Sequence, residues 1–138
     1  MENEITSMVK VGFGIIIGFI SSLIGGLDEL FTMLIIMIVI DLISGIMKGI
    51  VNKNINGEKF YKGGFKKLSI FLVVVVGTQI EIYLGSGIPL RSISITYYII
   101  SEGISFIENI SYFVDLPEPF IKYFKDENVN NEGDDKDE

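Results

Sequence analysis

The sequence contains no cysteine and no histidine. Without cysteine, the chain can form neither a disulfide framework nor a thiolate metal site. Without histidine, it lacks the commonest metal ligand and general base, which excludes a catalytic triad that depends on that residue. Gly12 and Gly14 stand too deep in an apolar run to form a phosphate-binding loop. No catalytic constellation remains, and we expect a protein that is not an enzyme and holds no metal or cofactor.

Charged residues are also scarce wherever hydrophobic residues gather. Hydrophobic residues make up 49% of the chain and fall into four blocks, a segregation typical of integral membrane proteins. The central block, Leu30 to Met47, contains a single charged residue, Asp41. As a helix it would extend roughly 27 Å, close to the thickness of the hydrocarbon core of a bilayer. A buried helix of a soluble protein is the alternative, which the three similar blocks disfavour.

The net charge of −7 comes from the end of the chain. From Asp126 onward there are seven acidic residues against Lys136, which leaves eleven acidic and ten basic residues before that point. A segment this rich in like charge and this poor in apolar residues does not bury a core. We therefore predict a nearly neutral membrane domain over residues 1–125 and a disordered acidic tail over residues 126–138.

The four blocks predict an all-α membrane bundle with four transmembrane helices, or with three. The predicted spans cover residues 11–27, 30–47, 68–84 and 92–107. The fourth is the weakest, because it contains Glu102 together with serines and tyrosines. The first block follows a nearly charge-neutral start and lacks a good cleavage site, so we expect a span rather than a signal peptide. The short turn at Asp28 and Glu29 predicts that the first two spans form an antiparallel hairpin.

A polar loop over residues 48–67 is predicted between the second and third spans. Its lysine excess over Glu58 predicts a cytoplasmic loop that contacts anionic lipid head groups, and four spans would then place both termini in the cytoplasm. A nucleic-acid patch is disfavoured, because the loop has no arginine and lies between two spans. The predicted surface lysines are Lys48, Lys53, Lys59, Lys62, Lys66 and Lys67.

Small residues recur every four positions in the first two blocks. In a membrane helix such a stripe lets another backbone approach closely, although glycine is also common in membrane helices without this role. The sequence leaves open whether the partner helix belongs to the same chain or to a neighbouring copy. The predicted helix-packing residues are Gly14, Gly18, Ser22, Gly26 and Gly45.

Three carboxylates, Asp41, Glu81 and Glu102, stand one in each of three predicted spans. Acids inside a membrane are candidates for ion sites or for the lining of a water-filled space. The alternative is that they pair with Lys48, Arg91 or serine hydroxyls inside the bundle. We favour pairing for Glu81, which lies near the outer end of its span, and leave both interpretations open for Asp41 and Glu102.

Three short motifs stand in order along the chain: DLISG at residues 41–45, GGFKK at residues 63–67, and SEGISFIEN at residues 101–109 followed by two prolines. Together they resemble the motifs of the toxin-secretion and phage-lysis holin family. The resemblance covers about residues 34–124. Ser101 stands where that family often has asparagine, Asp115 stands where it often has glycine, and the acidic tail replaces a commonly basic one. The motif residues are Asp41, Ser44 and Gly45; Gly63, Gly64, Lys66 and Lys67; and Glu102, Gly103, Ser105, Glu108, Asn109, Pro117 and Pro119.

The resemblance implies a small membrane protein that oligomerises in the cytoplasmic membrane of a bacterium and opens lesions. Such lesions release an endolysin or a large toxin, and the sequence does not choose between these tasks. The implied partners are the lipid bilayer, further copies of the chain, and that endolysin or toxin, with no nucleic acid. Asp41 and Glu102 would then face the interior of the assembly. The competing functions are a small ion or solute transporter, which usually needs a larger chain, and a non-conducting membrane scaffold.

Overall fold

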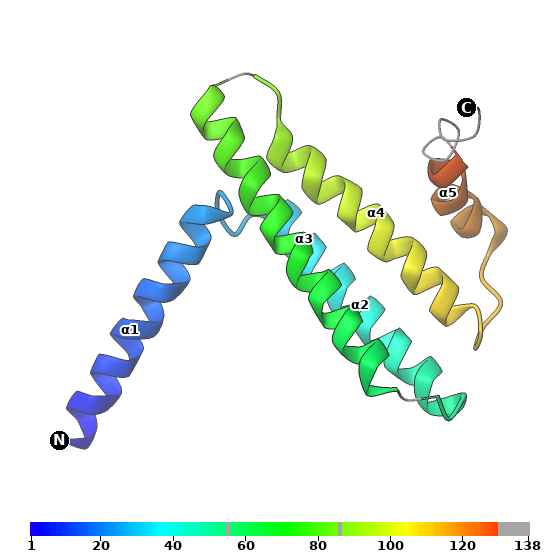
Figure 1. Ribbon diagram of the computed structural model, residues 1–138, viewed down its shortest axis with the longest axis horizontal. Coiled ribbons are helices and arrows are strands. Elements are labelled where there is room, and N and C mark those ends of the chain that lie inside the picture. Colours follow the sequence, from blue (N-terminus) through cyan, green and yellow to red (C-terminus); the bar gives the residue numbers. More distant parts are fainter. Residues whose placement is uncertain (55, 86, 130–138) are drawn as a thin grey trace.

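The computed structural model describes residues 1–54, 56–85 and 87–129, and the described residues form helices and no strand. The predicted all-α fold is confirmed. The helices are α1 (Glu2–Leu23), α2 (Glu29–Val51), α3 (Gly57–Leu84), α4 (Leu90–Ile110) and α5 (Glu118–Val129) (Figure 1).

Helices α2, α3 and α4 form the bundle, in which α4 packs along α2 and also against α3. Leu34, Ile70, Val74 and Ile95 from these helices are fully buried at its centre. The chain reverses direction between α2 and α3 and again between α3 and α4, so α3 runs antiparallel to both neighbours (Figure 1). Helix α5 returns beside α4.

Helix α1 diverges from the bundle (Figure 1), so the predicted hairpin of the first two spans is wrong. None of its residues is buried, and it contacts α3 of the bundle. The cause lies in the turn that follows it. Gly25 and Gly26 have φ angles of +78° and +106°, which side chains rarely allow, and they direct α2 away from α1. Gly26 therefore lies outside α1 and does not belong to the stripe of small residues on that helix.

Local capping explains why the helix bounds differ from the predicted ones. The Asp28 carboxylate accepts from the N–H of Phe31 at the start of α2, and the Asn56 side chain accepts from the N–H of Glu58 at the start of α3. Gly85, at a φ of 55°, ends α3. Residues 48–51 and 57–67 are therefore helical, and the predicted loop over residues 48–67 is reduced to a turn between Val51 and Gly57.

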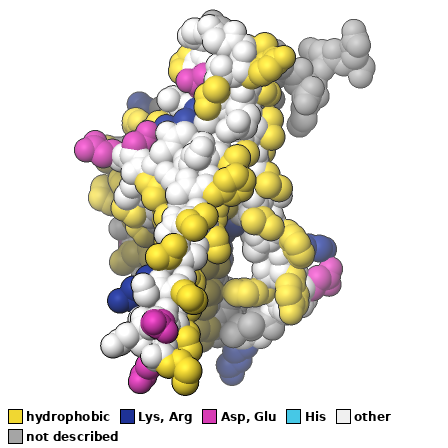
Figure 2. Space-filling model, turned by 90° about the vertical axis from the view of Figure 1, so that its left-hand side faces the viewer, with side chains coloured by type: hydrophobic (Ala, Val, Ile, Leu, Met, Phe, Trp, Pro, Cys, Tyr) yellow, Lys and Arg dark blue, Asp and Glu magenta, His cyan; other side chains and the backbone are white. Residues whose placement is uncertain are grey.

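Three helices, α1, α2 and α3, are long and apolar enough to cross a membrane. Their large hydrophobic side chains are exposed in the single chain, and Figure 2 shows such side chains spread over the face turned to the viewer. Helix α4 does not meet the same criterion but lies along α2 and α3. In the predicted acidic tail, residues 126–129 belong to α5, and residues 130–138 lie outside the described part of the chain.

Candidate functional site

Three charged side chains from three different helices meet inside the bundle. The Nζ atom of Lys67 on α3 donates to Oδ2 of Asp41 on α2 at 2.7 Å, and it also binds Oε2 of Glu102 on α4. The side chains of Lys67, Asp41 and Glu102 are only 14%, 10% and 1% exposed. We call these three residues the lysine triad. It joins helices whose other contacts are largely apolar.

Asn109 completes the surroundings of Asp41. Its Nδ2 atom donates to Oδ1 of Asp41 at 3.1 Å, so both carboxylate oxygens of Asp41 have a partner. The amide also packs against Gly45, one turn further along α2, where a Cβ would lie at an ordinary contact distance of 3.5 Å from that nitrogen. The hydroxyl of Ser44 donates instead to the main-chain carbonyl of Asp41 at 2.9 Å. The predicted seam of small residues on α2 thus packs against α4.

The lysine triad is not electrically balanced, because two carboxylates share one ammonium group and the net charge is −1. Oε1 of Glu102 is buried and has no hydrogen-bond partner in the described part of the chain. An unsatisfied buried acceptor costs about 1–3 kcal/mol, and more when it is charged. The bundle is therefore held together by a cluster that is itself incompletely satisfied.

A cavity of about 550 Å³ lies between α2 and α3, next to the triad. Asp41 and Lys67 line one end of it, and Asn54 and Asn56 of the α2–α3 turn line the other. Glycine residues on both helices widen it, among them Gly63. The cavity therefore extends from the turn to the buried charges.

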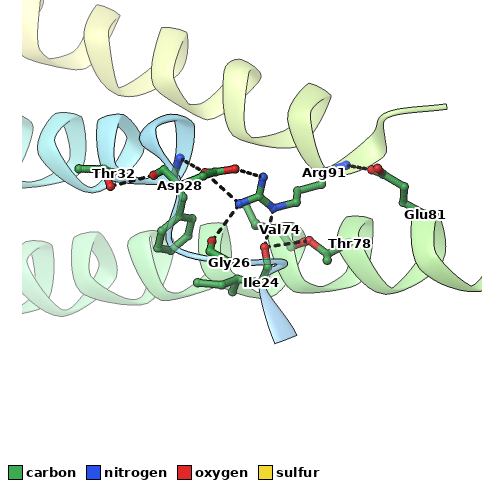
Figure 3. Close-up of polar contacts among 9 residues, drawn as sticks. Ile24, Gly26, Asp28, Thr32, Val74, Thr78, Glu81 and Arg91 are labelled. Carbon is green, nitrogen blue, oxygen red and sulfur yellow. Dashed lines mark hydrogen bonds and ion pairs between the residues drawn. The ribbon is translucent and has the colours of Figure 1, made fainter. Parts of the chain in front are cut away.

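A second polar cluster lies at the opposite end of the bundle, around Arg91 (Figure 3). Its guanidinium group donates to the carbonyls of Ile24 and Gly26 at 2.6 and 3.0 Å, and to both carboxylate oxygens of Asp28 at 2.7 and 3.1 Å. We call this set of contacts the Arg91 clasp. It ties the turn between α1 and α2 to the first turn of α4.

Neighbouring side chains reinforce the Arg91 clasp. The hydroxyl of Thr78 donates to the carbonyls of Val74 and Ile24, and the amide of Gln79 donates to the carbonyl of Leu23. Glu81 accepts from the backbone N–H of Arg91 at 2.9 Å, as Figure 3 shows. Glu81 therefore binds within the chain at the start of α4 and lies apart from the lysine triad.

The predicted stripe on α1 has no partner among the described residues of the chain. A Cβ at Gly14 or Gly18 would meet no atom within 4 Å, and Ser22 is exposed. The close helix contact occurs instead at Gly77 on α3, where a Cβ would lie 3.0 Å from Oγ of Ser94 and 3.2 Å from the carbonyl oxygen of Leu90. This contact was not predicted, because a single glycine in an apolar run carries no spacing signal.

Gly77→Ala should weaken the packing of α3 against α4. The added methyl group would press on backbone as well as on a hydroxyl, and overpacking of this kind typically costs about 1–3 kcal/mol. Gly64→Ala on the same helix is the control, because its Cβ would enter open space. Denaturant unfolding in detergent measures the effect, and equal stability of the two variants would show that α3 and α4 do not meet closely at Gly77.

A model of the bacteriophage holin family matches residues 18–126, which is most of the chain. The chain belongs to the bacteriophage holin family. Neither the curated proteins nor the solved structures contain a match to it.

In this holin-family chain, several residues of the three short motifs come together, although they lie far apart in the sequence. Asp41, Lys67, Glu102 and Asn109 form one connected network, and Gly103 is buried beside it. Other motif residues have separate positions. Gly64 and Lys66 are exposed, and Ser105 is partly buried. The main-chain carbonyl of Glu108 accepts a hydrogen bond from Lys48. Pro117 and Pro119 stand at the start of α5.

Lys67 is the largest correction to the predicted site of this holin-family chain. It was predicted as a surface lysine, but it lies inside the bundle because α3 begins ten residues earlier, at Gly57. The signal that could have revealed this is helical spacing. Lys67, Ile70, Val74 and Thr78 recur at intervals of three and four and share one face, and the last three are buried. Lys53, Lys59, Lys62 and Lys66 are exposed as predicted, and Lys48 is partly so.

Proposed function

We propose that this holin-family chain assembles into lesions in the cytoplasmic membrane, and that the lysine triad holds each copy closed beforehand. The observation that carries the proposal is the unpartnered Oε1 of Glu102 in a cluster of net charge −1. Charges inside a membrane protein are costly and are most stable when they face protein or water. If water entered between the helices, it would satisfy the acceptor that the closed bundle leaves unsatisfied.

Helix α1 supports assembly of many copies. It is apolar, long enough to cross the membrane, and unburied in the single chain. Its exposed Gly14, Gly18 and Ser22 would allow close approach by a helix of a neighbouring copy. In a bilayer, α1 faces either lipid or another copy, and the stripe favours another copy.

The orientation follows from the lysines of the α2–α3 turn and the first turns of α3. Their charge supports a cytoplasmic position for this end of the bundle. A membrane crossed by α2 and α3 also contains α4, which packs along both. Four crossings then place both termini in the cytoplasm. The released cargo would be an endolysin or a large toxin.

Glu102→Gln should delay opening. The substitution keeps the size of the side chain, retains the Asp41–Lys67 pair and brings the cluster to neutrality, so the closed state gains stability. A gain of about 1.4 kcal/mol would raise the copy density needed for opening about tenfold. The measurement is induced expression with timed potassium efflux, followed by lysis when a cytoplasmic endolysin is supplied.

Glu108→Gln is the matched control, because it removes a carboxylate from an exposed position on the same helix. An efflux schedule shared by Glu102→Gln and the wild type would contradict the role of the triad. Saturable flux of one solute would point to a transporter, and dye-loaded liposomes that stay intact at high protein density would point to a scaffold.

A further inference from the structure

We propose that the cavity between α2 and α3 binds the phosphodiester head group of an anionic phospholipid. This inference rests on the proposed orientation, which places the cavity at the cytoplasmic face. Its mouth is formed by the α2–α3 turn, where both helices leave the apolar part of the chain. Basic pockets between transmembrane helices on this side of a membrane are suited to acidic lipid head groups.

The charges at the mouth fit an anion. Lys48 on α2 and Lys59 on α3 line the cavity from opposite walls. Lys48 donates to the carbonyl of Glu108 at 3.3 Å, whereas Lys59 forms no ion pair with any described residue. Two ammonium groups on opposite walls can contact one phosphate from both sides.

The acidic groups nearby either lie at the inner end of the cavity or pair away from its mouth. Asp41, at the inner end of the cavity, is bound by Lys67 and Asn109. Glu58, in the first turn of α3, does not line the cavity and pairs with Lys62 at 2.8 Å. The excess negative charge of the lysine triad lies at the inner end of the cavity, so an anion at the mouth meets Lys48 and Lys59 first.

The polar and apolar walls together favour a lipid over a free phosphate ion. Asn52, Asn54 and Asn56 line the mouth and offer amide N–H groups to phosphate or glycerol oxygens. Leu42 and Ile46 also line the cavity and are exposed on α2. An acyl chain can lie along them while the head group occupies the mouth. A volume of about 550 Å³ lies within the range of sites for small ligands.

The test is native mass spectrometry of the full chain in detergent, titrated with phosphatidylglycerol. We expect Lys48→Gln/Lys59→Gln to weaken retention of one lipid about thirtyfold, at about 1 kcal/mol for each basic residue near an anionic group. Lys53→Gln/Lys66→Gln removes the same charge from exposed lysines that lie outside the cavity and form no ion pair with a described residue, and it should retain the lipid like the wild type. Lys59→Gln alone, which disrupts no contact of Lys48, should give an intermediate loss.

Equal losses in the two double variants would overturn the proposal, because binding would then be general electrostatic attraction. Retention of phosphatidylcholine as strong as that of phosphatidylglycerol would overturn it as well. Binding of free glycerol phosphate with the affinity of the lipid would assign the cavity to a soluble phosphate instead. The readout involves no permeabilisation. A chain that retains the lipid but never opens membranes would therefore contradict the proposed function alone.

Discussion

Lys67→Met should destabilise the bundle by about 3–5 kcal/mol, the usual cost of removing one partner from a buried ion pair. The substitution would leave Asp41 and Glu102 facing each other with no cation between them, while a side chain of similar length keeps the space filled. Asn109 would still bind Asp41, but an amide does not neutralise a carboxylate. Unfolding in mixed detergent micelles, followed by circular dichroism, measures the loss of stability.

Two further variants separate charge from packing in this prediction. Lys66→Met changes the adjacent, exposed lysine and should leave stability within about 0.5 kcal/mol of the wild type. Replacing all three residues of the triad, as Asp41→Leu/Lys67→Met/Glu102→Leu, should recover most of the loss, because well-packed apolar residues often substitute for buried ions without cost. A triple variant as unstable as Lys67→Met would show that the unpaired charges are not the cause.

Arg91→Gln should release the turn between α1 and α2. The variant loses hydrogen bonds to two main-chain carbonyls and to the carboxylate of Asp28, and each bond that involves a charged group contributes about 1.5–3 kcal/mol. Because the chain has no native cysteine, a single Ile24→Cys substitution reports on this turn, where Ile24 is 3% exposed. We expect maleimide labelling at this position to become at least about tenfold faster, equivalent to about 1.4 kcal/mol of easier opening.

Gly25→Ala tests the Arg91 clasp from its other side. A Cβ at Gly25 would lie 2.8 Å from Nε of Arg91, and the φ of +78° disfavours a side chain there. Gly25→Ala should therefore reproduce the faster labelling of Ile24→Cys. Arg91→Lys keeps the positive charge but loses the planar guanidinium group, so it should give an intermediate labelling rate. Unchanged labelling in Arg91→Gln would show that apolar packing alone holds the turn.

Acidification to mild pH should not open the Arg91 clasp. The hydrogen bond from Arg91 is the largest cause that lowers the pKa of Asp28 below its ordinary value of 3.8, and the N–H of Phe31 adds to it. A lowered pKa in the folded state means that the contribution to stability is present above pH 3.8 and is lost only as the pH falls through the lower value. The labelling rate of Ile24→Cys, divided by that of free cysteine at the same pH to correct for the falling thiolate fraction, should therefore stay constant between pH 7 and pH 5.

The sequence was sufficient to predict the fold class and to single out Asp41 and Glu102, but not to predict that Lys67 pairs with them. Asp41 and Glu102 stand out because each is isolated in an apolar helix. Lys67 does not stand out, because it ends a lysine-rich segment, and its spacing to Ile70, Val74 and Thr78 becomes informative only once α3 is known to begin at Gly57. Helix bounds set by capping are local, whereas the pairing of α2, α3 and α4 around one ammonium group depends on tertiary packing.

The Arg91 clasp was hidden for a different reason. Two of its acceptors are the main-chain carbonyls of Ile24 and Gly26. Because every residue has a main-chain carbonyl, residue type does not indicate which of them will accept a hydrogen bond. Gln79 likewise binds only backbone at the end of α1. The divergence of α1 could not be predicted either, because the positive φ angles of Gly25 and Gly26 follow from a turn geometry that their residue type permits but does not require.

The length of α3 has a consequence for where the chain can reside. Its 28 residues extend about 42 Å, against about 30 Å of hydrocarbon in a typical bilayer. The excess is taken up by tilting or by projection of the lysine-bearing turns into the head-group layer. A thicker bilayer would draw those turns towards acyl chains, whereas a thinner one would leave more of the helix in water. Membrane thickness thereby determines how far Lys67 of the lysine triad lies from the water at the membrane surface.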